Sequence, residues 1–153
     1  MLYLVQHGQA VSKDQDPDRP LSSQGESDVS RMAALLAAAG IVVDRIVHSG
    51  KTRAEQTAAI LANSLSDSGT IEVVDGINPN DSVAAFADQV VGWNTPVMVV
   101  GHLPFMAKLV TRLAVPDREQ PVVEYQPGTV VCMAPDDSGH WAIQWMVRPE
   151  LLP

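Results

Sequence analysis

Two histidines and one arginine follow runs of apolar residues in this sequence, the histidines directly or one residue later and the arginine a few residues later. His7 follows the first apolar run and precedes Gly8, His102 follows the most apolar run of the chain, and Arg53 comes four residues after Ser49. A neutral imidazole can act as a nucleophile, and a guanidinium binds the oxygens of an oxyanion in a planar fork. If the fold brings these side chains together, they predict phosphoryl transfer, with one histidine attacking and the other stabilising charge.

The elements that must position these residues alternate along the chain. Amphipathic helical patterns separate four short apolar runs, and two strand-like runs joined by a turn-rich segment close the sequence. Such alternation predicts an α/β fold, a three-layer α/β/α sandwich with a mostly parallel sheet and an antiparallel hairpin at the C-terminal end. The expected strands are residues 2–5, 45–48, 71–74, 96–100, 129–134 and 140–147. We expect one domain over residues 1–153.

In a sheet of this kind, ligands bind beyond the carboxyl ends of the strands. His7, the segment from Ser49 to Arg53, and His102 should all lie at this edge. Ser49 is also expected to cap the following helix, and Pro104 suits the start of the helix after His102. Helix amino ends offer unpaired N–H groups, so the edge is predicted to bind an oxyanion.

The composition indicates which classes of partner the protein is not expected to bind. The chain has a formal net charge of −8, with 46% hydrophobic and 18% charged residues. An acidic protein without a basic face is not expected to bind nucleic acid or an anionic membrane. Cys132 is the only cysteine, which excludes an intrachain disulfide. No apolar run has the length of a membrane span, so we expect a cytoplasmic protein.

Four fragments together resemble the histidine phosphatase superfamily, and within it the small phosphohistidine phosphatases of the SixA type. These are the strand ending in His7-Gly8, the loop Asp18-Arg19-Pro20-Leu21-Ser22 with Gly25 behind it, Ser49-x-x-x-Arg53-Ala54-x-x-Thr57, and Val99-Val100-Gly101-His102-Leu103-Pro104. The resemblance covers nearly the whole chain and implies a phosphoglycerate mutase-like fold. The short length favours the SixA type over the mutases, which carry insertions.

The resemblance also implies roles. His7 is similar to the nucleophile that becomes phosphorylated, His102 to its partner histidine, and Arg53 to a phosphate-binding arginine. Arg19 looks like a further arginine that reaches the phosphate. Gly8 and Leu103 flank the two histidines and are expected to contribute to phosphate binding.

The sequence departs from the family pattern at two places. Gln6 stands where the family usually has arginine, and a neutral hydrogen bond is worth about 1 kcal/mol against about 1.5–3 kcal/mol for a charged one. The glutamate expected near Gly76 as general acid is absent, which leaves Asp75 or Asp81 as candidates. A missing acid fits a phosphohistidine substrate, because its imidazole leaving group is far less basic than an alkoxide.

The expected function is therefore a cofactor-free phosphatase that removes phosphate from a phosphorylated histidine on a partner protein, such as a histidine phosphotransfer domain. Two alternatives remain open. A usable acid at Asp75 or Asp81 would favour a phosphatase of small phosphate esters, whereas Gln6 could make the protein a weak phosphate binder without turnover. A metal site formed by His48 with His7 and His102 is disfavoured, because no carboxylate cluster accompanies them.

Overall fold

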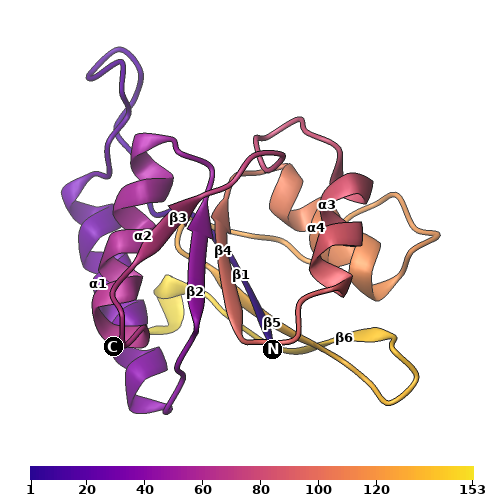
Figure 1. Ribbon diagram of the computed structural model, residues 1–153. Coiled ribbons are helices and arrows are strands. Elements are labelled where there is room, and N and C mark those ends of the chain that lie inside the picture. Colours follow the sequence, from indigo (N-terminus) through magenta and orange to yellow (C-terminus); the bar gives the residue numbers. More distant parts are fainter.

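A single six-stranded sheet with helices on both sides forms the framework of the protein. The computed structural model describes residues 1–153, and Figure 1 shows the sheet between two pairs of helices. The strands follow the order β3-β2-β4-β1-β5-β6. Their bounds are β1 Leu2–Gln6, β2 Arg45–His48, β3 Ile71–Val73, β4 Val97–Gly101, β5 Val130–Pro135 and β6 Trp141–Val147. The helices are α1 Ser23–Ala38, α2 Thr52–Leu65, α3 Val83–Val91 and α4 Phe105–Ala114, and a 3₁₀ turn, η1, spans Pro149–Leu151.

The strand directions confirm the predicted fold class. β1 pairs with β4, and β2 pairs with both β4 and β3, all in parallel. β5 pairs antiparallel with β1 and with β6, so the sheet ends in the expected hairpin. Since parallel strands end at the same edge, β1, β2, β3 and β4 all deliver their carboxyl ends to one side of the molecule.

The central strand β1 is buried along its whole length because helices cover both faces of the sheet. Its side chains alternate between two cores, as the period of a strand requires. Leu2 and Leu4 pack in the core that contains residues of α3 and α4. Tyr3 and Val5 pack in the core that contains residues of α1 and α2. Packing on both faces therefore fixes the position of the carboxyl end of β1, where His7 follows.

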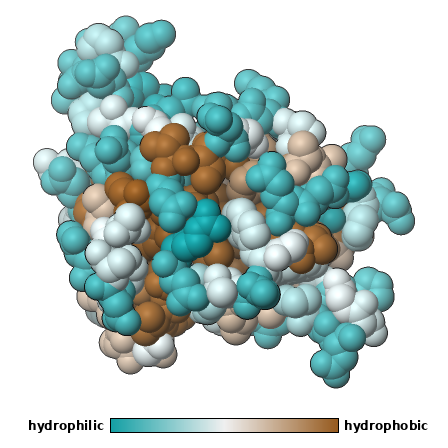
Figure 2. Space-filling view, viewed as in Figure 1, coloured by the Kyte–Doolittle hydropathy of each residue, from teal (hydrophilic) through white to brown (hydrophobic).

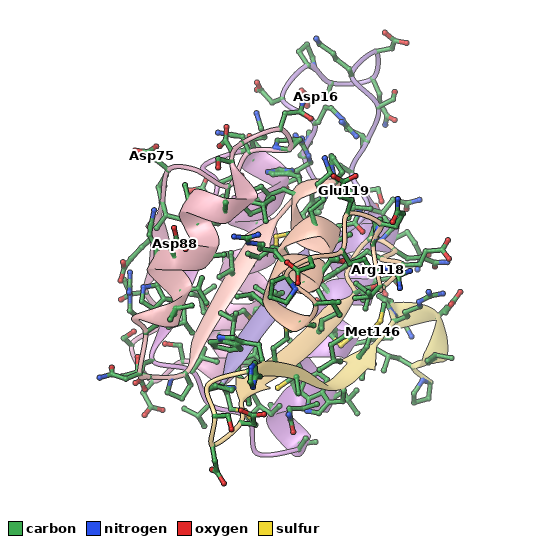
Figure 3. The ribbon with its side chains drawn as sticks, turned by 90° about the vertical axis from the view of Figure 1, so that its right-hand side faces the viewer. Asp16, Asp75, Asp88, Arg118, Glu119 and Met146 are labelled. Atoms are coloured by element: carbon green, nitrogen blue, oxygen red, sulfur yellow. The ribbon has the colours of Figure 1, made fainter.

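The early loop, residues 9–20, folds back on itself and projects beyond the sheet. Ala10 forms an isolated bridge with Leu21, and the Val11 N–H donates to the Pro20 carbonyl at 2.9 Å. The tip stands clear of the body in Figure 1, and Asp16 marks it in Figure 3. The loop therefore has a tethered base beside the sheet and an exposed, acidic tip.

The surface is largely polar, with apolar areas at particular places. Figure 2 shows brown, apolar surface in the part of the front face that β2 and β3 occupy in Figure 1, broken by hydrophilic atoms. The edge strand β3 leaves Val73 64% exposed. No helix is both long enough and apolar enough to cross a membrane.

Candidate active site

The backbone of His7 is held from two directions. Its N–H donates to the Gly101 carbonyl at 3.0 Å, and its carbonyl accepts from the Gly128 N–H at 3.1 Å. Gly101 is the last residue of the central strand β4, and Gly128 lies just before β5. The imidazole therefore projects from a fixed point at the carboxyl edge of the sheet.

Two hydrogen bonds define the tautomer of the His7 ring. Nδ1 lies 2.7 Å from the Gly8 carbonyl oxygen, which can only accept, so Nδ1 carries the proton. Nε2 accepts from Nε of Arg53 at 3.2 Å, which requires its lone pair. The ring is thus the tautomer with an unprotonated Nε2, whose lone pair is directed at the guanidinium of Arg53.

The surroundings keep this ring neutral. Burial lowers the pKa of His7 to about 4, and the nearby positive charges of Arg53 and Arg19 act in the same direction, against the hydrogen bond to Gly8. Arg53 sits in the first turn of α2 and makes no hydrogen bond or ion pair through its Nη atoms. Both Nη groups are thus available to an oxyanion next to Nε2 of His7.

Gly8 links the segment that carries His7 to the helix that carries Arg53. Its N–H donates to Oγ1 of Thr57 at 3.0 Å, and the same hydroxyl donates to the Arg53 carbonyl at 2.7 Å. A Cβ at Gly8 would come within 2.7 Å of Cγ2 of Val29 in α1. Only glycine lets the chain after His7 approach the helices this closely. Thr57 was noted in the sequence only as part of a motif, and its hydroxyl bridge could not be predicted from spacing.

His102 lies opposite His7. The two ring centroids are 5.0 Å apart at an interplanar angle of 55°. Burial lowers the pKa of His102 to about 3, helped by His7, Arg53, Lys51 and Arg19. Lys51 is a cation of this site that the sequence analysis missed. The available signal was its position between Ser49 and Arg53, but many lysines in such positions are solvated.

Ser49 does not cap α2, contrary to the prediction. The helix begins at Thr52 with Lys51 as its N-cap, and no side chain caps it. The hydroxyl of Ser49 instead lies 2.5 Å from Nε2 of His102 and accepts from the Lys51 N–H at 3.4 Å. The hydroxyl can donate to Nε2 of His102 or accept from it, and in either case the bond holds the orientation of the ring.

Two buried polar atoms at this edge have no hydrogen-bond partner, Nδ1 of His102 and Oε1 of Gln6. His102 is 2% exposed and Gln6 8%. Buried polar groups are normally paired, so these two atoms are exceptions at this edge of the sheet. The side chain of Gln6 makes no hydrogen bond with the protein, which leaves its amide free to donate to an anion.

Arg19 and Leu103, which were also predicted to bind phosphate, lie in loops beside the two histidines. Nε of Arg19 donates to the Val11 carbonyl at 3.2 Å, and its charge acts on both histidines, so it belongs to the same electropositive region. Arg19 has a φ of 49°, an unusual conformation for a residue with a side chain. Leu103 follows His102 and is 37% exposed.

The two candidate acids are not joined to the histidines. Oδ2 of Asp81 accepts from the Asn78 N–H at 2.8 Å and closes a turn of its own loop. Asp75 is exposed, and Figure 3 shows it at the margin of the molecule with its carboxylate directed outward. Neither carboxylate forms a hydrogen bond or an ion pair with a residue of the site. Their role as a general acid stays a prediction.

His48 has a local structural partner. It is 2% exposed at the end of β2, and its Nδ1 accepts from the Gly50 N–H at 3.1 Å. Burial lowers its pKa as well. One of its two ring nitrogens is thus occupied by the turn that leads into α2.

This combination of fold and paired histidines agrees with the comparison of the sequence with known families. Residues 2–78 match the model of the histidine phosphatase superfamily (branch 1). The chain belongs to this superfamily.

Individual relatives sharpen the assignment. The chain is 26% identical to phosphohistidine phosphatase SixA of Escherichia coli (strain K12) over 153 residues, which cover 97% of this chain and 93% of SixA. An uncharacterized protein of Picosynechococcus sp. is 31% identical over 74% of this chain and 72% of its own length. Together with family membership, the similarity to SixA supports a phosphatase.

Solved structures show the same fold. The protein histidine phosphatase SixA complexed with tungstate superimposes with a TM-score of 0.83 at 24% identity, covering 97% of this chain and 96% of that one. A phosphoserine phosphatase from Entamoeba histolytica, solved with 3-phosphoglyceric acid, gives a TM-score of 0.73 at 14% identity over 96% of both chains. The predicted phosphoglycerate mutase-like, SixA-like architecture is thereby confirmed.

Proposed function

We propose that the protein is a metal-independent phosphatase that hydrolyses phosphohistidine on a partner protein through a phospho-His7 intermediate. The observation that carries the proposal is the His7 ring, whose Nε2 lone pair faces the guanidinium of Arg53 beside a second neutral histidine. The similarity to a relative named phosphohistidine phosphatase supports the choice of substrate. A histidine phosphotransfer domain is the kind of partner we have in mind.

The mechanism uses these groups in two steps. Nε2 of His7 attacks phosphorus in line while the bond from phosphorus to the imidazole of the substrate breaks. Arg53, Arg19 and the Gln6 amide hold the phosphoryl oxygens, and His102 supports the developing charge. Water then attacks phospho-His7, and inorganic phosphate leaves with His7 restored to its neutral form. Gly8 and Leu103 border the phosphate position.

The leaving group explains why a general acid can be dispensed with. The far ring nitrogen of the substrate imidazole can be protonated from solvent before the bond breaks, because an imidazole has an ordinary pKa of about 6.5, and the ring then leaves as a neutral base. An alkoxide is far more basic and needs a proton during bond cleavage. Neither Asp75 nor Asp81 is bonded to the site, and this favours a nitrogen–phosphorus bond over an ester. A phosphatase of small esters is the second candidate, and it would need one of these acids to reach the leaving oxygen.

The test offers three substrates to the purified protein. They are a phosphorylated histidine phosphotransfer domain, free phosphohistidine and a simple phosphate ester. We expect phosphate release from the first two and, after rapid quenching, an acid-labile, base-stable label on His7. Release from the ester alone would refute the proposed substrate. Binding of phosphate without label or release would identify a phosphate-binding protein. This is the alternative suggested by Gln6, which stands where the family usually has arginine.

A further inference from the structure

An apolar groove of about 560 Å³ opens beside the candidate active site. One wall is Leu103, Pro104 and Ala107 at the start of α4, and the other is the segment 121–125. Leu103 directly follows His102, and the second wall leads on to Gly128, whose N–H bonds the carbonyl of His7. Both walls therefore continue into the residues that hold the two histidines.

Hydrogen bonds fix the second wall in place. The Val122 N–H donates to Oγ1 of Thr111 in α4 at 3.0 Å, and the Tyr125 hydroxyl donates to the Leu4 carbonyl of β1 at 3.1 Å. Oγ1 of Thr111 in turn donates to the Ala107 carbonyl at 2.9 Å. The groove is thus preformed, and a ligand that fills it loses little free energy to ordering of the protein.

The lining identifies the kind of ligand. Its only charged residue is Glu124, whose carboxylate forms no hydrogen bond or ion pair. Sites for small polar molecules bring several polar groups together around the ligand, and this groove has no such cluster. A free phosphate ester that reaches His7 would leave it empty. Apolar side chains on the surface of a macromolecule match the apolar lining of the groove.

The charge of the protein also indicates which kind of ligand the groove binds. Asp14, Asp16 and Asp18 project on the early loop from the α1 and α2 side of the site, and none of them is in an ion pair. With a net charge of −8, the protein repels a small anion at long range but attracts a macromolecule that carries basic side chains around its phosphate.

We propose that this groove docks the phosphoprotein substrate: it receives apolar side chains next to the phosphorylated histidine, while Glu124 faces a basic side chain of the partner. The inference rests on the proposed function and adds to it the surface and chemistry by which the partner is recognised. Catalysis and recognition then use neighbouring sets of residues that meet at Leu103.

The experiment compares two substrates with the same leaving imidazole, a phosphorylated histidine phosphotransfer domain and free phosphohistidine. Pro121→Glu and Val123→Glu place a charge in the groove, and Val91→Glu places the same charge on an exposed valine of α3 outside it. Pro121 is exposed, so its variant should leave the core intact. We expect the groove variants to lower kcat/KM at least tenfold on the phosphoprotein, through KM, and less than twofold on free phosphohistidine. Val91→Glu should match the wild type on both.

Glu124→Lys tests the electrostatic part. It should raise KM for the phosphoprotein several-fold and weaken its dependence on salt, with free phosphohistidine unaffected.

Other results of these experiments would overturn either the docking proposal or the proposed function. Groove variants that match the wild type on the phosphoprotein would overturn the docking proposal and leave the phosphatase standing. Equal losses on both substrates, with unchanged thermal unfolding, would overturn it too, since the effect would lie in the phosphate pocket. Self-association of the wild type that Val123→Glu abolishes would assign the groove to a second copy. A wild type inactive on both substrates would instead refute the proposed function.

Discussion

The carboxyl ends of β1, β2 and β4 differ from the carboxyl end of β3, although all four strands reach the same edge. The first three ends deliver His7, Ser49 and His102, each held by buried hydrogen bonds or by close packing. The end of β3 delivers an exposed loop with Asp75 on the outside. This edge therefore holds ordered hydrogen-bonding groups around His7 but no carboxylic acid of comparable order.

This difference follows from the place of the strands in the sheet. β4 and β1 are central and buried throughout, whereas β3 is an edge strand whose Val73 is 64% exposed. A residue that follows a buried strand is held in position by the packing of that strand on both faces. A residue that follows a short edge strand lacks this packing. The difference favours an enzyme that stabilises transferred phosphate and leaves the proton to solvent.

The largest effect is expected at His7. His7→Asn removes the nucleophilic nitrogen, and kcat for phosphohistidine hydrolysis should fall at least roughly 1,000-fold, because both steps depend on the covalent intermediate. The label on the protein should vanish in the same quench experiment. His140→Asn is the matched control, since His140 lies in the exposed β5–β6 turn with its side chain 84% exposed. Substantial turnover by His7→Asn would contradict the central role of the β1 end.

Arg53 comes next. Arg53→Lys keeps the charge but loses the planar fork and the bond to His7. Loss of one charge-assisted hydrogen bond, about 1.5–3 kcal/mol, corresponds to a fall in kcat/KM of roughly 10- to 150-fold. Arg45→Lys is the control, because Arg45 at the start of β2 pairs with the exposed Glu72 and lies over the ring of Trp93, at the opposite end of the strand from Ser49. An equal response of the two variants would mean that Arg53 acts as an ordinary surface charge.

Sequence reasoning succeeded where strong local patterns decide the outcome. The apolar runs, the alternation with helices and the final hairpin predicted the sheet, and the strand ends predicted which residues share an edge. It failed at Ser49, because capping is judged from neighbouring residues, whereas its hydroxyl is taken by His102, which is 53 residues away in sequence. Lys51 and the Thr57 bridge were missed for the same reason.

Gln6 offers a gain of function. Gln6→Arg would add a charged donor beside His7, and the difference between a neutral bond of about 1 kcal/mol and a charged one of about 1.5–3 kcal/mol predicts a roughly 2- to 30-fold lower Kd for inorganic phosphate. Titration calorimetry with phosphate measures this directly. Gln144→Arg on the exposed face of β6 adds the same charge elsewhere and should change Kd little. Unchanged affinity in Gln6→Arg would show that the amide does not face the phosphate.

Ser49 should have a smaller, more specific effect. Ser49→Ala removes one hydrogen bond to His102, and a neutral bond of about 1 kcal/mol corresponds to a roughly fivefold lower kcat. The informative readout is the ¹⁵N NMR spectrum of His102, in which the Nε2 signal should shift because its partner is lost. Ser49→Thr, which keeps the hydroxyl, should restore the wild-type spectrum, and Ser64→Ala on the exposed side of α2 should change nothing. A wild-type spectrum in Ser49→Ala would exclude the positioning role.

The smallest effects are expected at the end of β3, and they test the comparison most directly. Asp75→Asn should leave kcat on phosphohistidine within twofold, because the exposed carboxylate has no bond to the site and the imidazole leaving group needs no acid. Asp81→Asn should slightly lower thermal stability, since Oδ2 accepts the Asn78 N–H, but should not change the chemistry. If either variant abolished hydrolysis of a phosphate ester while sparing phosphohistidine, that loop would supply a proton after all. The β3 end would then be a second, substrate-dependent part of the active site.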